Sequence, residues 1–322
     1  MSASDQRQTT SNAARSKWDG IVPPLVTPLS GRDTLDTAGF DRLIEHVIGG
    51  GVTGVFVLGT TGEGPCLSRR LRRDVVVQAT RTVKGRVPVL VGVTDCAMAE
   101  AVASMREAAE AGADAVVAAP PFYLPLDQDE VVNYYRALAA QSPLPLFVYN
   151  MPALTKVGIL PDTVRRLMEI ERIAGLKDSS GNKDSVVGLV ELARERPGWP
   201  VFAGHEHLLI DALRAGAAGG VCAGANVFPR MLVGAYEAVR TGDAAAIEEF
   251  QKTAEARRGI YNLLERGTPG TIRTLKAALG LLNICADHMS EPFERLSSDQ
   301  LERLNARLGE LGVNADGAIS TS

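Results

Sequence analysis

Lys177 has the strongest chemical signature in the chain, within the run "IAGLKDSSG" at residues 173–181. Seven lysines stand against 27 arginines, so a lysine at the end of an apolar run is a specific choice. A neutral lysine amine attacks carbonyl carbons, and desolvation in an apolar interior favours the neutral form, whereas arginine keeps its charge. Lys177 is a candidate Schiff-base nucleophile, although a lysine extending from a strand end to water fits the same pattern.

Two other stretches offer groups that imine chemistry needs. The loop "GTTGEG" at 59–64 has small residues whose backbone N–H groups can converge on a carboxylate or phosphate. Its glycine order matches neither a Walker A loop nor a dinucleotide fingerprint. Tyr149, in the apolar run "PLFVYN", has a phenol that can accept and return a proton. Taken singly, a tight turn and a core tyrosine explain these stretches equally well.

Apolar runs typical of strands alternate with longer amphipathic segments. The continuous rather than alternating polarity of the runs is typical of parallel strands covered by helices on both faces. The expected strands are 20–28, 54–59, 87–93, 115–121, 145–150, 173–178, 200–204 and 219–224. The expected intervening helices are 36–48, 68–83, 97–111, 128–140, 161–170, 183–195 and 206–215.

This alternation predicts an α/β fold, a (β/α)8 TIM barrel with a C-terminal helical extension. A doubly wound open sheet is the competing fold, but it usually has fewer strands. We expect a disordered N-terminal arm at 1–17, the catalytic barrel at 18–235, a helical domain at 236–314 and a flexible tail at 315–322. Helices are expected in the second domain at 243–266, 270–282 and 297–311.

Composition narrows the class of protein. The net charge of −4, with both signs interspersed, predicts no nucleic-acid or membrane partner. No apolar stretch reaches the length of a spanning helix, and the N-terminus has no signal-peptide core. The four cysteines show no metal-binding spacing. We therefore expect a reduced, cytoplasmic enzyme without disulfides or a metal, acting on small molecules.

In a barrel enzyme the reactive groups follow the C-terminal ends of the strands. Those positions hold Thr27, 59–64, Asp95, 120–123, 149–152, Lys177, 204–207 and 223–226. His205 and His207 could suggest a metal pair, but no third ligand is evident, so substrate contact or a surface role is the better interpretation.

The motifs "GTTGEG", "YNMP" and "GLKDSSG", in this order and spacing, resemble the pyruvate-dependent class I aldolases typified by N-acetylneuraminate lyase and dihydrodipicolinate synthase. The likeness extends from about Gly20 to Leu308. It implies a (β/α)8 barrel with a C-terminal helical domain, no cofactor, and commonly a homotetramer arranged as a dimer of dimers.

The resemblance also implies roles for individual residues. Lys177 would form the Schiff base with a 2-oxo acid such as pyruvate, and Tyr149 would relay protons. The backbone at Thr60 and Thr61 would hold the carboxylate, and the Thr60 hydroxyl would link Tyr149 toward solvent. Tyr123 would enter the site of a neighbouring subunit. Flanking positions expected to contact substrate are Gly59, Gly204, His205, Ala223 and Asn226.

Departures from the synthase pattern bear on the substrate. Leu154 stands where synthases carry an arginine for the carboxylate of aspartate semialdehyde, and Lys156 stands where a glycine is usual. A leucine cannot replace a bidentate clamp, although Lys156 could reach in as a point charge. His205, Glu206 and Asn226 suit a polyhydroxylated tail.

We therefore expect a Schiff-base lyase acting on a 2-keto-3-deoxy sugar acid or a similar 2-oxo acid, with an aldehyde as the second product or substrate. The alternatives are a dehydratase or hydratase-aldolase using the same lysine imine, dihydrodipicolinate synthase itself, and a non-catalytic 2-oxo acid sensor.

Overall fold

The computed structural model describes residues 16–262 and 267–313. The expected tail at 315–322 and nearly all of the expected arm at 1–17 lie outside these residues. Within the described chain, eight parallel strands form one sheet in the order β1-β10-β9-β8-β7-β6-β5-β4. They are β1 (Gly20–Ile21), β4 (Val55–Val57), β5 (Val89–Gly92), β6 (Ala115–Ala118), β7 (Leu146–Asn150), β8 (Ile173–Asp178), β9 (Val201–Ala203) and β10 (Gly219–Gly220).

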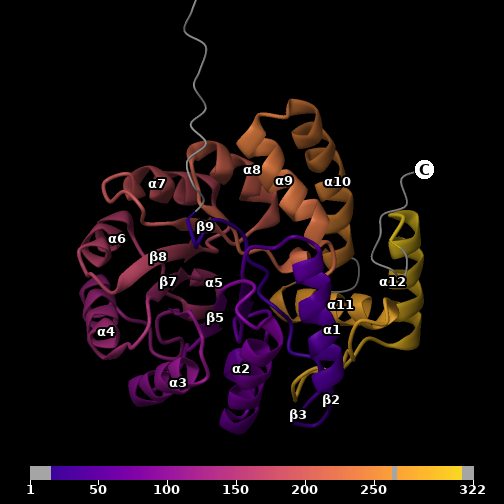
Figure 1. The fold of residues 1–322 in the computed structure, drawn as a ribbon, viewed down its shortest axis with the longest axis horizontal. Coiled ribbons are helices and arrows are strands. Elements are labelled where there is room, and N and C mark those ends of the chain that lie inside the picture. Colours follow the sequence, from indigo (N-terminus) through magenta and orange to yellow (C-terminus); the bar gives the residue numbers. More distant parts are fainter. Residues whose placement is uncertain (1–15, 263–266, 314–322) are drawn as a thin grey trace, which may run out of the picture.

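The two outer strands of this order meet and close the sheet. A parallel bridge joins Pro24 to Phe56, and the Leu25 N–H donates to the Phe56 carbonyl at 2.8 Å. The expected strand 20–28 is shortened to Gly20–Ile21 with this single bridge. Pro23 and Pro24 have no N–H to donate, so a regular ladder cannot continue through them. The predicted (β/α)8 barrel is confirmed (Figure 1).

A ring of helices surrounds the barrel (Figure 1). These are α1 (Thr37–Gly49), α2 (Arg69–Val83), α3 (Met98–Glu110), α4 (Gln128–Gln141), α6 (Pro161–Met168), α7 (Lys183–Ala193), α8 (Glu206–Ala215) and α9 (Pro229–Thr241). The sequence analysis did not predict α9, and the expected domain boundary at 235/236 falls inside it. The short α5 (Pro152–Thr155) and the 3₁₀ turns η1 (Gly64–Cys66) and η2 (Ala223–Asn226) lie in loops.

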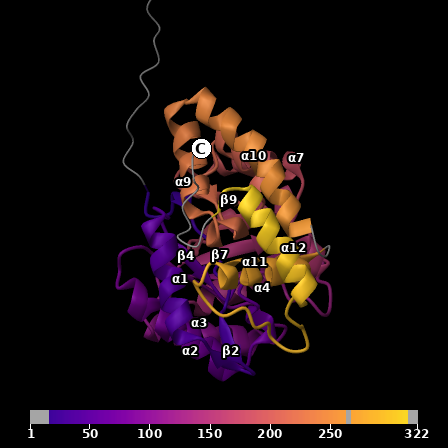
Figure 2. The same ribbon diagram turned by 90° about the vertical axis from the view of Figure 1, so that its right-hand side faces the viewer.

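The first of the C-terminal helices packs against α8 and α9, and the other two follow in sequence, each against the one before it (Figure 2). They are α10 (Ala244–Asn262), α11 (Thr268–Leu281) and α12 (Ser298–Glu310). Among the described residues, no helix is both long and apolar enough to cross a bilayer.

The barrel has two apolar layers. Alternate strand residues point inward, among them Val22, Leu90, Val117 and Phe147, and fill the interior. The other set packs against the helices in a larger core. Every residue of β4, β5, β6 and β7 is buried, which explains the continuous apolar runs in the sequence.

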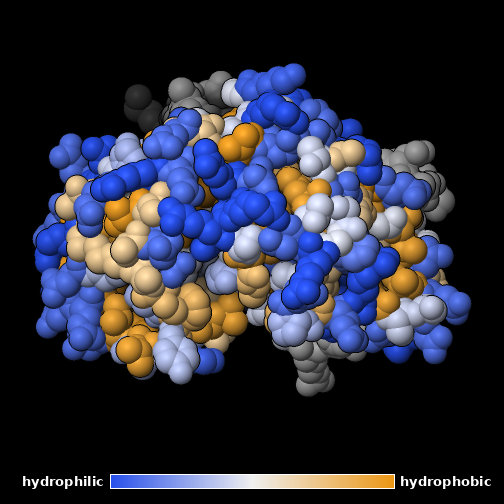
Figure 3. Space-filling view, turned by 90° about the horizontal axis from the view of Figure 1, so that it is seen from below, coloured by the Kyte–Doolittle hydropathy of each residue, from blue (hydrophilic) through white to orange (hydrophobic). Residues whose placement is uncertain are grey.

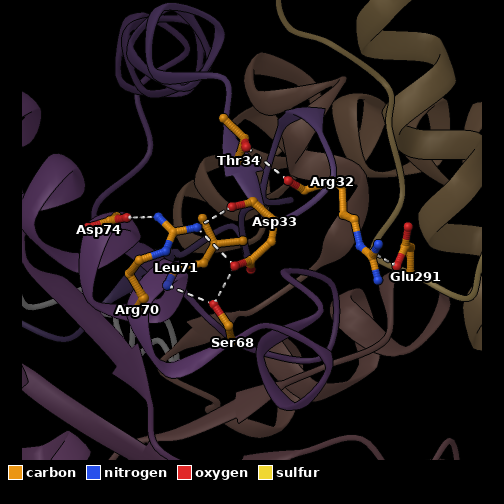
Figure 4. A network of polar contacts seen from close by, with 8 residues as sticks. All are labelled: Arg32, Asp33, Thr34, Ser68, Arg70, Leu71, Asp74 and Glu291. Carbon is orange, nitrogen blue, oxygen red and sulfur yellow. Dashed lines mark hydrogen bonds and ion pairs between the residues drawn. The ribbon is translucent and has the colours of Figure 1, made fainter.

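A small hairpin that the sequence analysis did not predict, β2 (Leu29–Gly31) and β3 (Thr34–Leu35), ties the barrel to the C-terminal region. Figure 4 shows Arg70 between Asp33 and Asp74, with the Ser68 hydroxyl donating to Asp33 at 2.9 Å. On the other side, Arg32 pairs with Glu291 at 3.0 Å.

The surface is not uniformly polar. On the face drawn in Figure 3, hydrophobic residues gather in patches between hydrophilic ones. The large apolar side chains exposed on the molecule include Phe122, Tyr123 and Leu124 in the loop after β6, and Leu154 and Leu160 after β7. These loops follow neighbouring strands, so they present apolar groups near the same end of the barrel.

The capping box of α12 makes a testable contribution to local stability. The Ser297 hydroxyl accepts from the Gln300 N–H at 3.3 Å, and the Gln300 side chain accepts from the Ser297 N–H at 3.0 Å. Ser297→Ala should weaken α12 by about 1 kcal/mol. Faster amide hydrogen exchange in the first turn of α12 would show this. Ser298→Ala, at an exposed neighbouring position, is the matched control, and equal exchange in both variants would contradict the assignment.

Candidate active site

Lys177 lies inside the barrel mouth and not on its outer rim. In the β7–β8 register it is opposite Tyr149, and in the β8–β9 register it is opposite Phe202. Its side chain is 5% exposed. The Nζ lies 4.0 Å from the centroid of the Tyr149 ring and 5.2 Å from that of Phe56. The alternative of a lysine extending to water therefore does not describe this side chain.

Tyr149 has the contacts of a proton-transfer group. Its hydroxyl lies 3.2 Å from the Thr60 hydroxyl. Burial acts to raise the pKa of Tyr149, but the Lys177 ammonium and hydrogen bonds with Thr60, Ser179 and Lys177 outweigh it, and the pKa is lowered from its ordinary value of 10. The Lys177 ammonium thus favours the phenolate form of Tyr149.

The strand ends that carry this pair are joined by a second set of polar contacts. The Asn150 amide donates to Asp178 at 2.6 Å, and the Ser180 hydroxyl donates to its other oxygen at 2.7 Å. The Asn150 side-chain oxygen accepts from the Ile159 N–H at 3.1 Å. These bonds join the ends of β7 and β8 and so stabilise the contact between Lys177 and Tyr149.

The 59–64 loop folds tightly against its own strand. A Cβ at Gly64 would lie 2.1 Å from the Leu58 carbonyl oxygen, so only glycine permits this approach. The Thr27 hydroxyl donates to the Gly62 carbonyl at 2.7 Å. The backbone N–H groups of Thr60 and Thr61 donate to no other residue in the described part of the chain. Since both residues line the cavity with Lys177, these groups can bind a carboxylate there.

One cavity of about 640 Å³ contains most of the predicted site. The structure brings together Thr60, Thr61, Tyr149, Lys177, Gly204, His205 and Ala223 in its lining. Glu206 also lines it and accepts from the Gly224 N–H at 2.7 Å. Lys177, Tyr149 and the 59–64 loop lie at one end of the cavity. The other end extends under the C-terminal helices.

Four predicted residues do not line the cavity of their own protomer. Asn226 is fully buried, with its amide donating to the carbonyls of Pro24 and Ala223 and its oxygen accepting from the Val26 N–H. It therefore braces the loops after β1 and β10 and is not positioned to contact substrate. Gly59 packs against the Phe56 ring, from which a Cβ at this position would lie only 2.6 Å away.

The remaining two lie on the surface. Lys156 is exposed, and its Nζ donates to the Ala153 carbonyl at 2.9 Å, so it does not reach in as a point charge. Tyr123 is 83% exposed.

Several lining residues were missed by the sequence analysis. Ser179 directly follows β8, two residues after Lys177, and its hydroxyl is within reach of Tyr149. The period of two along an extended chain could have indicated this. The distal wall comes from the C-terminal helices, through Phe250, Gln251, Ala254, Tyr261, Thr268, Thr271 and Ile272. No local motif marks these positions, because only tertiary packing carries them to the barrel mouth.

The electrostatic character of the cavity changes along its length. Among the described lining residues, Lys177 is the only lysine or arginine. The distal part holds Glu206 and Asp211 beside His205 and His207, whose rings are 5.4 Å apart. No cluster of three His, Cys, Asp or Glu residues suited to a metal ion occurs in the described ranges. The distal part therefore offers neutral and acidic hydrogen-bonding groups.

Comparison with known proteins shows the family of the chain. The model of the dihydrodipicolinate synthetase family matches residues 17–311. An uncharacterized DapA-like lyase of Halobacterium salinarum is 39% identical over 91% of this chain and 94% of its own length. A probable 2-dehydro-3-deoxy-D-pentonate aldolase of Escherichia coli, YjhH, is 35% identical over 77% of this chain and 83% of its own length.

Solved structures show the same fold. Dihydrodipicolinate synthase from Bacteroides thetaiotaomicron superposes with a TM-score of 0.88 at 40% identity, covering 91% of this chain and 99% of the other. YagE from E. coli, solved in complex with pyruvate, superposes with a TM-score of 0.85 at 28% identity, covering 91% and 98%. The chain therefore belongs to the dihydrodipicolinate synthetase family and is an enzyme of its aldolase and lyase class.

Proposed function

We propose that this enzyme is a Schiff-base-forming, pyruvate-dependent lyase that acts on a 2-keto-3-deoxy sugar acid. The observation that carries the proposal is the buried contact of Lys177 with Tyr149, beside the N–H groups of Thr60 and Thr61. The pyruvate complex of YagE supports pyruvate as the 2-oxo acid part. The name of the E. coli aldolase relative supports a deoxy sugar acid.

Imine formation follows from the arrangement. The substrate carboxylate accepts from the Thr60 and Thr61 N–H groups, which places the keto carbon near Lys177. The ammonium must lose a proton before it attacks, and Tyr149, whose lowered pKa favours the phenolate form, lies beside it to accept that proton. Tyr149 returns this proton to the carbinolamine oxygen, which leaves as water, so that an iminium on Lys177 and the Tyr149 phenolate remain.

Cleavage uses the iminium as the electron acceptor. The proton of the C4 hydroxyl passes to the Tyr149 phenolate as the C3–C4 bond breaks. The electron pair of that bond moves toward the iminium nitrogen. An aldehyde and an enamine result. Tyr149 then protonates C3, and water hydrolyses the iminium to pyruvate and the amine. Thr60 connects Tyr149 to the cavity and thus provides the path for proton exchange.

The distal cavity supports a neutral, hydroxylated tail. A second carboxylate would meet Glu206 there, and among the described residues Lys177 is the only lysine or arginine in the lining. Lys183 pairs with Asp211 at 3.0 Å but does not line the cavity. Sugar hydroxyls, in contrast, can bond to the polar lining. Leu154 is exposed and lies outside the cavity lining, so it supplies no carboxylate clamp. This weighs against dihydrodipicolinate synthase, although that name belongs to the Bacteroides structure.

Dehydration is the second candidate reaction, because the same iminium activates C3. Loss of a C3 proton beside the iminium can expel the C4 hydroxyl as water instead of breaking the carbon bond. Tyr149, which lies beside Lys177, can take the C3 proton and then return it to the departing C4 oxygen.

The exposed loop after β6 supports assembly with a second copy of the chain. Phe122, Tyr123 and Leu124 expose large apolar surfaces that a monomer would leave in water. We propose that Tyr123 enters the cavity of a partner and completes the proton path there.

Borohydride trapping tests the proposed function. Wild-type protein incubated with pyruvate and borohydride should gain one reduced pyruvyl adduct per chain on Lys177, because reduction fixes the imine as a secondary amine. Lys177→Met should gain none. Lys252→Met, which removes an exposed lysine paired with Glu248 on α10, should behave as wild type. Absence of an adduct in the wild-type protein, measured by peptide mass spectrometry, refutes the proposal.

Ionisation of Tyr149 gives a test with a defined sign. Its lowered pKa means that the phenolate forms below the pH at which an ordinary tyrosine ionises. Lys177→Met removes the ammonium, so burial should then raise the pKa. Ultraviolet titration, with Tyr149→Phe to assign the signal, should show a shift to higher pH in Lys177→Met. An unshifted Tyr149 signal would contradict the coupling. Tyr149→Phe should also reduce turnover by about 100- to 10,000-fold.

Product analysis separates the candidate reactions. With 2-keto-3-deoxy sugar acids of different tail lengths, cleavage should release pyruvate and an aldehyde, whereas dehydration releases no pyruvate. Condensation of pyruvate with aspartate semialdehyde should be slower than with neutral hydroxyaldehydes, because the cavity lacks a described clamp for the second carboxylate. A preference for aspartate semialdehyde would overturn the sugar-acid assignment.

A further inference from the structure

A deeply buried ion pair joins the 59–64 loop to the C-terminal helices. Glu63 is 3% exposed and Lys276, on α11, is 0% exposed, and their charged groups are in contact. Neither residue lines the substrate cavity. Removing two ions from water is costly, and replacement of such pairs by apolar residues is often neutral or stabilising. Fold stability alone therefore gives weak reason for a pair at this position.

The pair is held by backbone groups from a third segment. The Ser290 N–H donates to Glu63 Oε2 at 2.7 Å, and Lys276 Nζ donates to the His288 carbonyl at 2.7 Å. Both partners belong to the connection between α11 and α12. The Glu63 carboxylate is thus fixed by a side chain of α11 and by the backbone that follows it.

The position of Glu63 also determines the position of Thr60. The Glu63 N–H donates to the Thr60 carbonyl at 3.0 Å, and the Thr60 hydroxyl lies 3.2 Å from that of Tyr149. Glu63 itself is in the left-handed region, with φ of 57°, which a non-glycine residue adopts only when its surroundings hold it there. A shift of the Glu63 side chain would therefore be transmitted through one turn of backbone to the group that contacts Tyr149.

The same helix that holds Glu63 also forms part of the distal wall of the cavity. Thr268 and Ile272 line the cavity, and Lys276 follows at the next i+4 position of α11. One rigid element thus contacts both the tail end of the cavity and the carboxylate-binding loop. Among the described residues, the recorded partners of the Glu63 carboxylate, Lys276 and the Ser290 N–H, both lie outside the barrel.

We propose that Glu63 and Lys276 are positioning residues, whose ion pair sets the 59–64 loop so that Thr60 meets Tyr149 and the threonine N–H groups face the cavity. The effect on pyruvate turnover rests on the proposed function. The effect of the ion pair on the position of the 59–64 loop relative to Tyr149 does not. The C-terminal helices in this view align the proton-relay end of the site as well as closing its distal end.

The experiment compares Glu63→Gln, Lys276→Met and the double variant. Single variants leave one buried charge or polar group without its partner and can lose stability for that reason. The double variant has no unpaired charge, and the amide oxygen introduced by Glu63→Gln still accepts from the Ser290 N–H, so it should unfold near the wild-type temperature. In D2O, exchange of the pyruvate methyl protons reports imine and enamine formation without any aldehyde. The double variant should show a higher KM for pyruvate and exchange slowed on the order of 10- to 100-fold.

Ionisation of Tyr149 provides the readout that needs no substrate. The Thr60 contact helps to lower the pKa of Tyr149, so displacement of the loop should shift its titration to higher pH in the double variant. Addition of Tyr149→Phe to each background assigns the signal.

Leu304→Ala is the matched control for stability. Leu304 is buried in α12, which packs against α11 away from the 59–64 loop, so the truncation should lower the unfolding temperature while exchange and the Tyr149 titration stay at wild-type values. Wild-type exchange, pyruvate KM and Tyr149 titration in the double variant would overturn the positioning role. If borohydride traps no pyruvate on the wild-type enzyme, the proposed function fails, and the Tyr149 titration alone still decides the positioning role.

Discussion

The site depends on the register of two neighbouring parallel strands. Pairing of β7 with β8 places Lys177 opposite Tyr149, and in a parallel sheet directly opposed residues point to the same face. That face is the barrel interior, where both groups are nearly buried and Phe56 and Phe202 lie beside Lys177. In this setting the ammonium controls the ionisation of the phenol more strongly than it could in water. A shift of one residue in this register would turn Lys177 toward the helices and separate the pair.

The sequence allowed the barrel and its inner site to be predicted because both have local signatures. Buried parallel strands produce continuous apolar runs, and the reactive residues follow those runs at the strand ends. The expected strand 20–28 was too long because it was predicted from its apolar composition alone. Pro23 and Pro24 have no backbone N–H group, so they cannot continue the hydrogen bonds of the strand. Helix α9 was missed because its start at Pro229 follows the short turn η2 without a polar cap.

Other parts of the site had no signature that a single sequence could give. Asn226 and Lys156 follow strands as substrate-contacting residues often do, but position in the chain does not determine where a side chain points. The Asn226 side chain is hydrogen-bonded to the backbone of the loop after β1. The Lys156 amine is hydrogen-bonded to a carbonyl of the short helix α5 at the surface. Glu63 was part of a motif interpreted through its glycines, and its partner on α11 lies far along the sequence.

Under the proposed function, chemistry and substrate choice reside on different parts of the chain. The lysine and the phenol belong to β8 and β7 and the carboxylate loop follows β4, whereas the wall around the substrate tail belongs to α8, α10 and α11. Substitutions in that wall would then alter which aldehyde fits without displacing Lys177, which is consistent with a family that includes both a synthase and a pentonate aldolase by name. The separation is incomplete, however, because α11 also carries Lys276. A substitution that tilts α11 to admit a new substrate tail would also move Lys276 and thus Glu63. Only those changes of the wall that keep Thr60 in contact with Tyr149 would therefore preserve activity.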